Sequence, residues 1–215
     1  MSSNFSVQEL AIALTAKNLN PTSLNLDFLK YSDIVPTDWE LARPAIYSDR
    51  LVRLLFKNGV GIIAEDNRIV IEEDISAEDL NKVEVHKLAH RFSQKLSNLD
   101  YQAVGINPRG YSILPTSEPN YISNRLLDSG EWQNFGTLPV RASVNLAYTL
   151  ERGQLNLSIN QVSLRSSEQK VTPAVLFSGN FNYSVQGENR SDRLEDLHKS
   201  IDAWEEDLNT YISLI

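Results

Sequence analysis

The chain has 215 residues, of which 41% are hydrophobic and 22% are charged, and this ordinary globular composition excludes wholesale disorder. It contains no cysteine, which excludes disulfide scaffolds, zinc–thiolate and iron–sulfur sites and thiol catalysis. A formal net charge of −8 and the absence of Lys/Arg runs oppose binding to nucleic acids and to anionic membranes.

The chain does not begin with a basic segment followed by a long apolar run, and its apolar runs are only a few residues long. These features match neither a secretory signal nor a membrane-spanning helix. We therefore expect a soluble cytoplasmic protein without a membrane or nucleic-acid partner.

The first residues predict a strand and then short helical segments. Glu9–Lys17 is apolar enough for a buried strand, although Ser6 and Glu9 also match a helix capping box. Thr22–Tyr31 predicts a short helix capped by Thr or Ser at its start. Thr37–Glu40 predicts a capped helical turn.

Three strands joined by two tight turns are expected next. Asn58-Gly59 is a strong hairpin signal between Ala45–Lys57 and Val60–Glu65. Asp66-Asn67 then turns the chain into Arg68–Glu73. A long helix follows, with a predicted N-cap at Ser76 and an end near Asn98. Its apolar face is formed by residues at helical spacing: Val85, Leu88, Ala89, Phe92, Leu96 and Leu99.

The second half starts again with a strand and a helix. Tyr101–Asn107 is predicted as a strand that ends at Asn107-Pro108. Ser117 should cap a helix over Glu118–Ser129, and Gly130 should stop it. This helix is expected to direct three apolar residues inward: Ile122, Leu126 and Leu127.

Alternating strands follow. Val140–Glu151 alternates cleanly, and Leu155–Leu164 alternates with a phase slip at Asn160-Gln161 that predicts a bulge. Ser166–Thr172 is predicted as a polar loop, and Val175–Val185 as the last strand.

The final segment, Arg190–Ile215, predicts one long helix. Its apolar residues are spaced three and four apart: Leu194, Leu197, Ile201, Trp204, Leu208, Tyr211 and Ile215. This stripe matches either a coiled coil or a helix that covers a sheet. Trp and Tyr fit a coiled-coil seam poorly, so we favour the sheet cover. Leu197, Ile201, Trp204 and Leu208 should then be buried against strands of the same chain.

The order of strand, helix, three strands and long helix occurs twice. Four pairs of marks recur at offsets between 87 (107 minus 20) and 95 (139 minus 44): Asn20-Pro21 with Asn107-Pro108, Trp39 with Trp132, Pro44 with Pro139, and Gly59 with Gly153. The predicted fold class is therefore α+β, with two β-α-β-β-β-α repeats, 1–100 and 101–215, that form antiparallel sheet with both long helices on one face. The alternative is a single α+β domain with coincidental turns.

At the level of topology, this duplicated order resembles the folds of the TATA-binding protein and of the helix-grip class. The overall pattern, including Asp33–Glu40 and Phe177–Phe181, is also similar to an uncharacterised bacterial protein family without established activity. These resemblances imply a fold and no site residues.

The sequence assigns no catalytic, cofactor-binding or metal-binding residue. His86 and His90 are four apart on a helix and could chelate a metal with a third ligand such as Glu84. They lie away from the apolar stripe, however, so we interpret them and His198 as surface histidines.

No catalytic or binding role is assigned to the other polar groups either. The acidic triplets Glu72-Glu73-Asp74 and Glu205-Glu206-Asp207 are predicted to be solvated charge. Asn180 and Asn182 either line a polar groove or are ordinary exposed sheet residues. Trp39 and Trp132 are expected to be buried at the sheet–helix junction of each repeat.

Two functional hypotheses follow. The first is a non-enzymatic protein-interaction or adaptor module that binds a protein partner, or another copy of itself, through a sheet edge or an exposed sheet face. The alternative is a small-ligand-binding protein or enzyme with a cleft between the two repeats. Neither hypothesis requires a cofactor, and acidic mimicry of nucleic acid is a more distant third.

Overall fold

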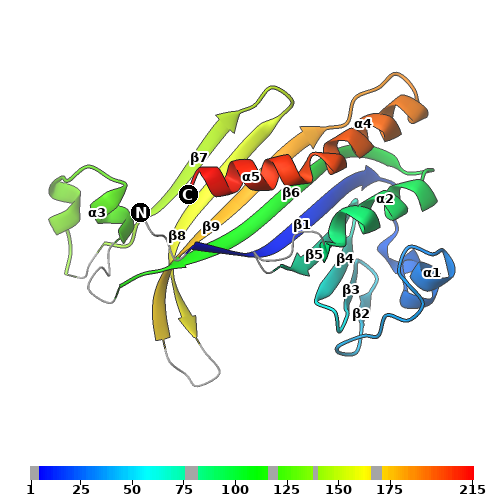
Figure 1. Cartoon of the computed structure of the whole chain (residues 1–215), viewed down its shortest axis with the longest axis horizontal. Helices are drawn as coiled ribbons and strands as arrows, with labels where there is room; N and C mark the ends of the chain where they lie inside the picture. Colours follow the sequence, from blue (N-terminus) through cyan, green and yellow to red (C-terminus); the bar gives the residue numbers. More distant parts are fainter. Residues whose placement is uncertain (1–4, 76–81, 116–120, 138–139, 166–170) are drawn as a thin grey trace.

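The computed structural model describes residues 5–75, 82–115, 121–137, 140–165 and 171–215 (Figure 1). Within these ranges, nine strands form one antiparallel sheet in the order β2-β3-β4-β5-β1-β6-β9-β8-β7. The strands are β1 (Phe5–Lys17), β2 (Ile46–Ser48), β3 (Leu51–Leu55), β4 (Val60–Glu65), β5 (Arg68–Asp74), β6 (Asp100–Ile113), β7 (Ser143–Thr149), β8 (Gln154–Arg165) and β9 (Val171–Ser184). The helices are α1 (Leu26–Tyr31), α2 (Val85–Lys95), α3 (Tyr121–Arg125), α4 (Arg190–Asp202) and α5 (Trp204–Ser213), with short 3-10 helices η1 (Pro21–Ser23) and η3 (Glu131–Asn134). The predicted α+β class is confirmed.

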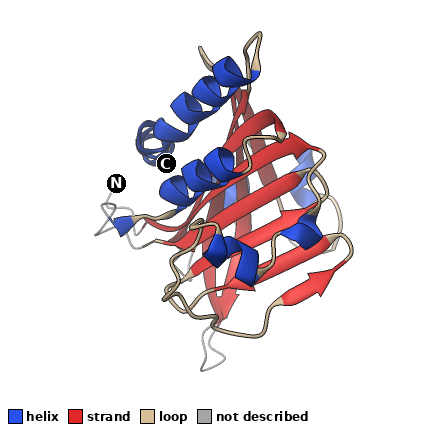
Figure 2. Ribbon diagram, turned by 90° about the vertical axis from the view of Figure 1, so that its right-hand side faces the viewer, coloured by secondary structure: helices blue, strands red, loops and turns tan. Residues whose placement is uncertain are grey.

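The helices α2, α4 and α5 pack on one face of the sheet (Figures 1 and 2). Helix α2 contacts β1 and β5, while α4 and α5 contact β6. Alternate side chains of each strand point to the same face, and those that point to the helices, such as Leu10, Ile12 and Leu14 of β1, are buried. The other face of these strands carries mostly polar and small residues.

Apart from β2, which has no counterpart at the other edge, the strands are arranged alike on the two sides of the β1–β6 pair. Strand β5 lies beside β1 as β9 lies beside β6, and each of these flanking strands is followed along the chain by a helix. The described strands of both halves therefore share one sheet.

The predicted first strand is present as β1, but the segments after it differ from prediction. The 3-10 helix η1 is capped by Asn20, and α1 is capped by Asn25, whose side-chain oxygen accepts from the Phe28 N–H at 2.9 Å. The helix therefore starts after Asn25, because Asn is among the best N-cap residues. The Thr37–Glu40 segment forms a turn and no helix.

The predicted strand Ala45–Lys57 is divided into two. Strands β2 and β3 pair with each other around Asp49-Arg50, a turn whose Asp is typical of turn positions. Both predicted tight turns are confirmed. Gly59 and Asn67 have positive φ values of 89° and 65°, which suit Gly and Asn.

Strand β6 does not end at Asn107-Pro108 but continues to Ile113. The ladder accommodates Pro108 because pairing with β9 lapses between Ile106↔Phe181 and Arg109↔Ser178. On the other side, Pro108 aligns with Leu10 next to a register shift in β1. A proline without an N–H is tolerated at such an irregularity.

Several predictions for the second half are wrong. Leu126 and Leu127 are 43% and 37% exposed, because α3 ends at Arg125, before either residue. Trp132 is 39% exposed and lies against Gly130, whereas Trp39 is half-buried with its ring edge against Phe56. Trp132 therefore does not have the predicted buried position, and Trp39 packs only partly buried, against Phe56.

The predicted bulge in β8 is absent, since β8 pairs with β9 in one continuous register from Gln154↔Asn182 to Arg165↔Val171. The phase slip has another cause: Leu155–Ile159 and Val162–Leu164 direct their apolar residues to opposite faces of a regular strand. The predicted N-cap at Ser76 is wrong, because α2 begins at Val85 and its N-cap position is Glu84. The Ser117 N-cap, Pro139 and most of the predicted loop Ser166–Thr172 lie outside the described residues.

The last helix is interrupted at Ala203 into α4 and α5. The four residues predicted to be buried are at most 4% exposed: Leu197, Ile201, Trp204 and Leu208. Tyr211 is fully buried, and its hydroxyl donates to the Phe177 carbonyl of β9 at 3.0 Å. The stripe is therefore a cover for the sheet of its own chain, as favoured.

Candidate functional site

The face of the sheet opposite to α2, α4 and α5, which we call the open face, carries a concentration of neutral polar side chains. In β6, β8 and β9 they alternate with buried residues, so they point away from the helices, and Asn145 of β7 pairs with Ser158 on the same face. We call this group the amide patch: Asn107 of β6, Ser178, Asn180 and Asn182 of β9, Asn156, Ser158 and Asn160 of β8, and Asn145 of β7. Every member is exposed or half-buried, so the patch is accessible to solvent.

Hydrogen bonds between neighbouring side chains, across strands and along β8, orient part of the amide patch. The Asn180 amide donates to the Asn107 side-chain oxygen at 2.5 Å. The Ser158 hydroxyl donates to the Asn145 side-chain oxygen at 2.7 Å and accepts from Asn160 at 3.0 Å. The Asn180–Asn107 and Ser158–Asn145 contacts link residues of adjacent strands, and the Asn160–Ser158 contact runs along β8. Asn156 and Asn182 remain exposed between them.

Towards β1 and β5 the open face becomes charged. Arg109 lies 3.8 Å from Glu9, and Arg53 lies 3.6 Å from Glu72. Burial raises the pKa of Glu9, Arg109 lowers it, and the nearby Glu72 and Asp74 raise it further. Opposite charges are interspersed, so this part of the open face has no single-sign field.

The amide patch can form hydrogen bonds but supplies no catalytic group. Each Asn offers a donor and an acceptor without a charge, and Ser offers both through one hydroxyl. The sequence identified only Asn180 and Asn182. The available signal was the identity of the polar residues in the alternating strands, which are Asn and Ser rather than Lys and Glu.

The three histidines are half-buried rather than exposed, which corrects the prediction. They converge between α2 and the C-terminal helices. The His86 ring stacks on Trp204 at 5.0 Å between centroids, and the His90 ring lies 4.6 Å from that of His198. His90 Nε2 is 2.7 Å from Asp202 Oδ1, 112 residues further along the chain.

These contacts join helices to each other. Burial lowers the pKa of His86. Burial and the nearby His90 both lower the pKa of His198. Ser93 contacts His198 Nε2 at 2.8 Å, while Glu84, suggested as a third metal ligand, pairs with Lys87 at 2.7 Å. Among the described residues, no group of three His, Asp or Glu side chains is placed to hold a metal ion.

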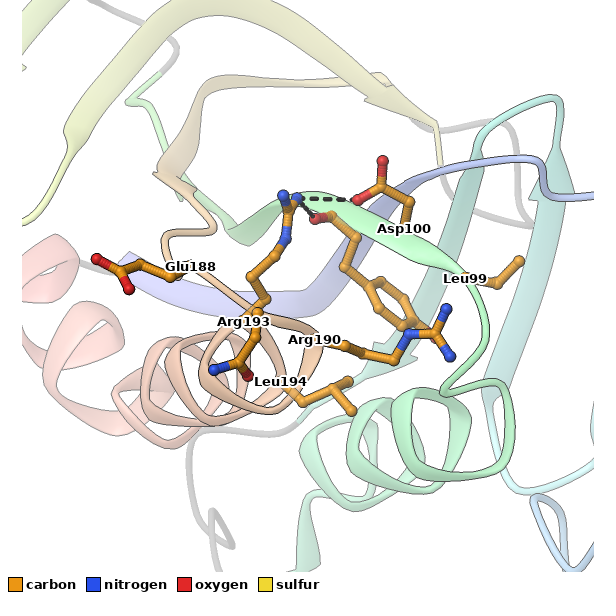
Figure 3. Close-up of a pocket in the computed structure, with 8 residues that line it drawn as sticks. Leu99, Asp100, Glu188, Arg190, Arg193 and Leu194 are labelled. Atoms are coloured by element: carbon orange, nitrogen blue, oxygen red, sulfur yellow. Dashed lines mark hydrogen bonds and ion pairs between the residues drawn. The ribbon is translucent and has the colours of Figure 1, made fainter.

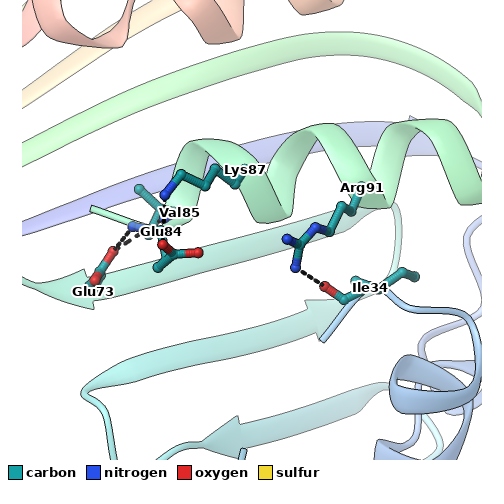
Figure 4. Close-up of polar contacts among 6 residues, drawn as sticks. All are labelled: Ile34, Glu73, Glu84, Val85, Lys87 and Arg91. Carbon is teal, nitrogen blue, oxygen red and sulfur yellow. Dashed lines mark hydrogen bonds and ion pairs between the residues drawn. The ribbon is translucent and has the colours of Figure 1, made fainter. Parts of the chain in front are cut away.

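The acidic triplets are only partly solvated. The Glu73 carboxylate is 9% exposed and accepts from the backbone N–H groups of Glu84 at 2.7 Å and Val85 at 3.2 Å (Figure 4). It therefore caps the start of α2, where a negative charge is favourable. Burial raises the pKa of Glu73, and the two N–H groups lower it. On the same helix, Arg91 donates to the Ile34 carbonyl at 3.5 Å.

Asp207, in the second triplet, is 6% exposed. One carboxylate oxygen accepts from the Tyr183 hydroxyl at 2.6 Å, and the other has no hydrogen-bond partner among the described residues. Burial raises the pKa of Asp207 to about 6, against the effects of Tyr183 and Arg152. The prediction of solvated charge is wrong at this position.

A pocket of about 220 Å³ lies where the start of β6 meets the start of α4 (Figure 3). Arg193 spans it to Asp100 at 3.1 Å and also donates to the Tyr101 carbonyl. Arg190 lies on the same wall and has no ion-pair partner in the described part of the chain. Leu99 and Leu194 add apolar surface.

The sequence matches no protein-family model, and no curated protein matches it. No helix within the described ranges is both long enough and apolar enough to cross a membrane.

Proposed function

We propose that this chain is a non-enzymatic protein-interaction module that binds another protein through the open face of its sheet. The observation that carries the proposal is the amide patch, an accessible surface of one chemistry built from four adjacent strands. A sheet holds these side chains at fixed spacing, so they lose little freedom when a partner binds.

The chemistry of the amide patch suits a polypeptide partner. Neutral amides and hydroxyls match the backbone and polar side chains of a protein, and their burial does not require the desolvation of an ion. The net charge of −8 disfavours a nucleic acid at the same surface. The histidines, the groups best suited to acid–base chemistry, are engaged between helices rather than on this face.

Affinity capture from a native extract tests this function when two matched variants are compared with the natural chain. Asn156→Arg with Asn182→Arg places bulk and charge on exposed positions of the amide patch. Gln94→Arg makes the same kind of change on the exposed surface of α2. We expect the first variant to lose a captured protein at least about tenfold, which corresponds to roughly 1.4 kcal/mol, and Gln94→Arg to retain it. Equal capture by all three proteins would contradict the proposal.

A second candidate is a small-ligand site in the pocket between Leu99–Tyr101 and α4. It is favoured by its position at the boundary of the proposed repeats and by the Arg190 guanidinium, which no described residue pairs and which would recognise a carboxylate or phosphate. A thermal-shift screen of small anions checks it. A stabilisation that Arg190→Ala removes would support this candidate, and no stabilisation by any anion would dismiss it.

We also infer that the chain consists of two repeats, 1–100 and 101–215. The similar strand order on the two sides of the β1–β6 pair supports this, although β2 has no counterpart. Gly59 and Gly153 support it as well, because they lie in the connections of the hairpins β3–β4 and β7–β8. The Asn-Pro marks do not correspond, because Asn20-Pro21 follows β1 whereas Asn107-Pro108 lies inside β6. Separately produced repeats should associate into the native fold when mixed, and two repeats that never combine would argue for one indivisible domain.

A further inference from the structure

Among the described strands, β7 forms one edge of the sheet, and its side away from β8 is suited to pairing with another strand (Figure 1). Its seven residues, Ser143–Thr149, include no charge, proline or glycine. Exposed edges of other proteins are commonly protected by Lys, Pro or a bulge. Within β7 none of these devices is present, since its register with β8 is continuous.

The pairing with β8 shows which backbone groups of β7 are free. The Leu150 N–H donates to the Gly153 carbonyl at 2.9 Å, so Leu150 belongs to a hydrogen-bonded pair. In an antiparallel ladder, such pairs alternate with pairs whose backbone groups point away. The backbone N–H and C=O groups of four alternate residues therefore point out from the edge: Ser143, Asn145, Ala147 and Thr149.

The sequence around β7 is complementary to itself when read in the opposite direction about Leu146. An antiparallel second copy centred on Leu146 places Val144 opposite Tyr148 and Asn145 opposite Ala147. The outward backbone groups then meet in register, because Asn145 and Ala147 both belong to the free set. Val144 and Tyr148 are half-buried and Leu146 is 37% exposed, so their apolar surface remains available for a contact.

The charges just outside the strand follow the same symmetry. Arg141 lies two residues before β7 and five before Leu146, and Glu151 lies in the turn after β7, five residues after Leu146. The register, continued past the strand ends, brings each Arg141 near the Glu151 of the second copy. Both are exposed, and neither has an ion-pair partner among the residues that the structure describes. On a chain of net charge −8, this edge joins opposite charges where most other surfaces would bring like charges together.

We propose that two copies of this chain associate through their β7 edges, in an antiparallel pair centred on Leu146 and closed by two Arg141–Glu151 ion pairs. The sheet then continues from one copy into the other. Antiparallel addition of a strand gains main-chain hydrogen bonds along the whole edge. The association uses the edge and leaves the open face free, so it stands apart from the proposed partner surface.

A charge-swap series measured by sedimentation or light scattering tests this register. Arg141→Glu places two carboxylates opposite each other at both ends, and we expect the dimer dissociation constant to rise roughly tenfold, from the loss of two exposed ion pairs. Arg141→Glu combined with Glu151→Arg restores opposite charges and should restore the natural constant. Lys95→Glu makes the same charge change at the end of α2 and should leave the constant unchanged.

A backbone variant tests the edge independently of charge. Ala147→Pro removes an outward N–H that β8 does not use, so the chain should fold but remain monomeric at concentrations where the natural chain dimerises. If this variant does not fold, the charge-swap series decides alone. A natural chain that stays monomeric while a foreign polypeptide occupies the edge, or a dimer insensitive to the Arg141→Glu change, would overturn the proposal.

Discussion

At the scale of single residues, the buried polar groups are the features that depend most on tertiary structure. Asp207 is the clearest case, because the residue is 6% exposed and one oxygen of its carboxylate has no partner in the described part of the chain. A buried carboxylate disfavours its charged form, so its pKa rises. Ionisation of Asp207 must therefore oppose folding.

We predict that the stability of the chain carries a pH dependence from Asp207. Its pKa is raised in the folded state from an ordinary value of 3.8 to about 6, so the folded state binds more protons than the unfolded state between these values. The free energy of unfolding then decreases as the pH rises through this window, by roughly 3 kcal/mol once Asp207 is fully ionised.

Asp207→Asn removes this ionisation. As the pH rises from about 4 to above 6, the free energy of unfolding of the variant should therefore increase relative to that of the natural chain. Denaturant titrations of both proteins across this range measure it. The shifted groups Glu9, Glu73, His86 and His198 are present in both proteins and cancel in the comparison. A difference that does not change with pH would show that Asp207 keeps an ordinary pKa.

Two tryptophans provide a matched pair at the same scale. Trp204 is 4% exposed and stacks on His86, whereas Trp132 is 39% exposed. Trp204→Ala should lower the free energy of unfolding by roughly 3–5 kcal/mol, and Trp132→Ala by about 0.5 kcal/mol. Denaturant unfolding of both variants checks this order, and equal losses would mean that Trp204 is not part of the core.

At the scale of elements, local signals located most strands and turns, and long-range packing decided the rest. Alternation identified β9, and Asn58-Gly59 and Asp66-Asn67 identified their turns, because these signals lie within a few residues. The convergence of His90 on Asp202 could not be found in this way, since the two lie 112 residues apart. The prediction that β6 ends at Pro108 was wrong for a similar reason. The gap in pairing that accommodates this proline depends on β9, which lies far along the chain.

The C-terminal helices are an element on which the fold should depend. A chain that ends before Arg190 exposes the apolar residues that α4 and α5 cover on β6 and β9, so we expect it to lose its cooperative thermal transition. A chain that ends at Ser213 removes only Leu214 and Ile215 and should melt near the natural temperature. Circular dichroism during heating distinguishes them, and a native-like transition in the shorter chain would show that these helices are not required.

At the scale of the whole molecule, the α+β class and the placement of the helices on one face follow from sequence patterns. The amide patch was not predicted from the sequence, although its Asn and Ser residues stand at alternating positions of the predicted strands. Their significance depends on strand order, which brings β6, β9, β8 and β7 together, and β6 lies far from the others in sequence. A single sequence specifies which face a residue occupies more readily than which strand lies beside it.

The central claim is that the open face contacts a protein partner, and site-specific photo-cross-linking tests it most directly. A photoreactive amino acid is placed at Asn156, within the amide patch, or at Gln94, on the exposed surface of α2. After irradiation in a native extract, the proposal predicts a discrete protein adduct from position 156 and none from position 94. An adduct from position 94 alone, or no adduct from position 156, would contradict it.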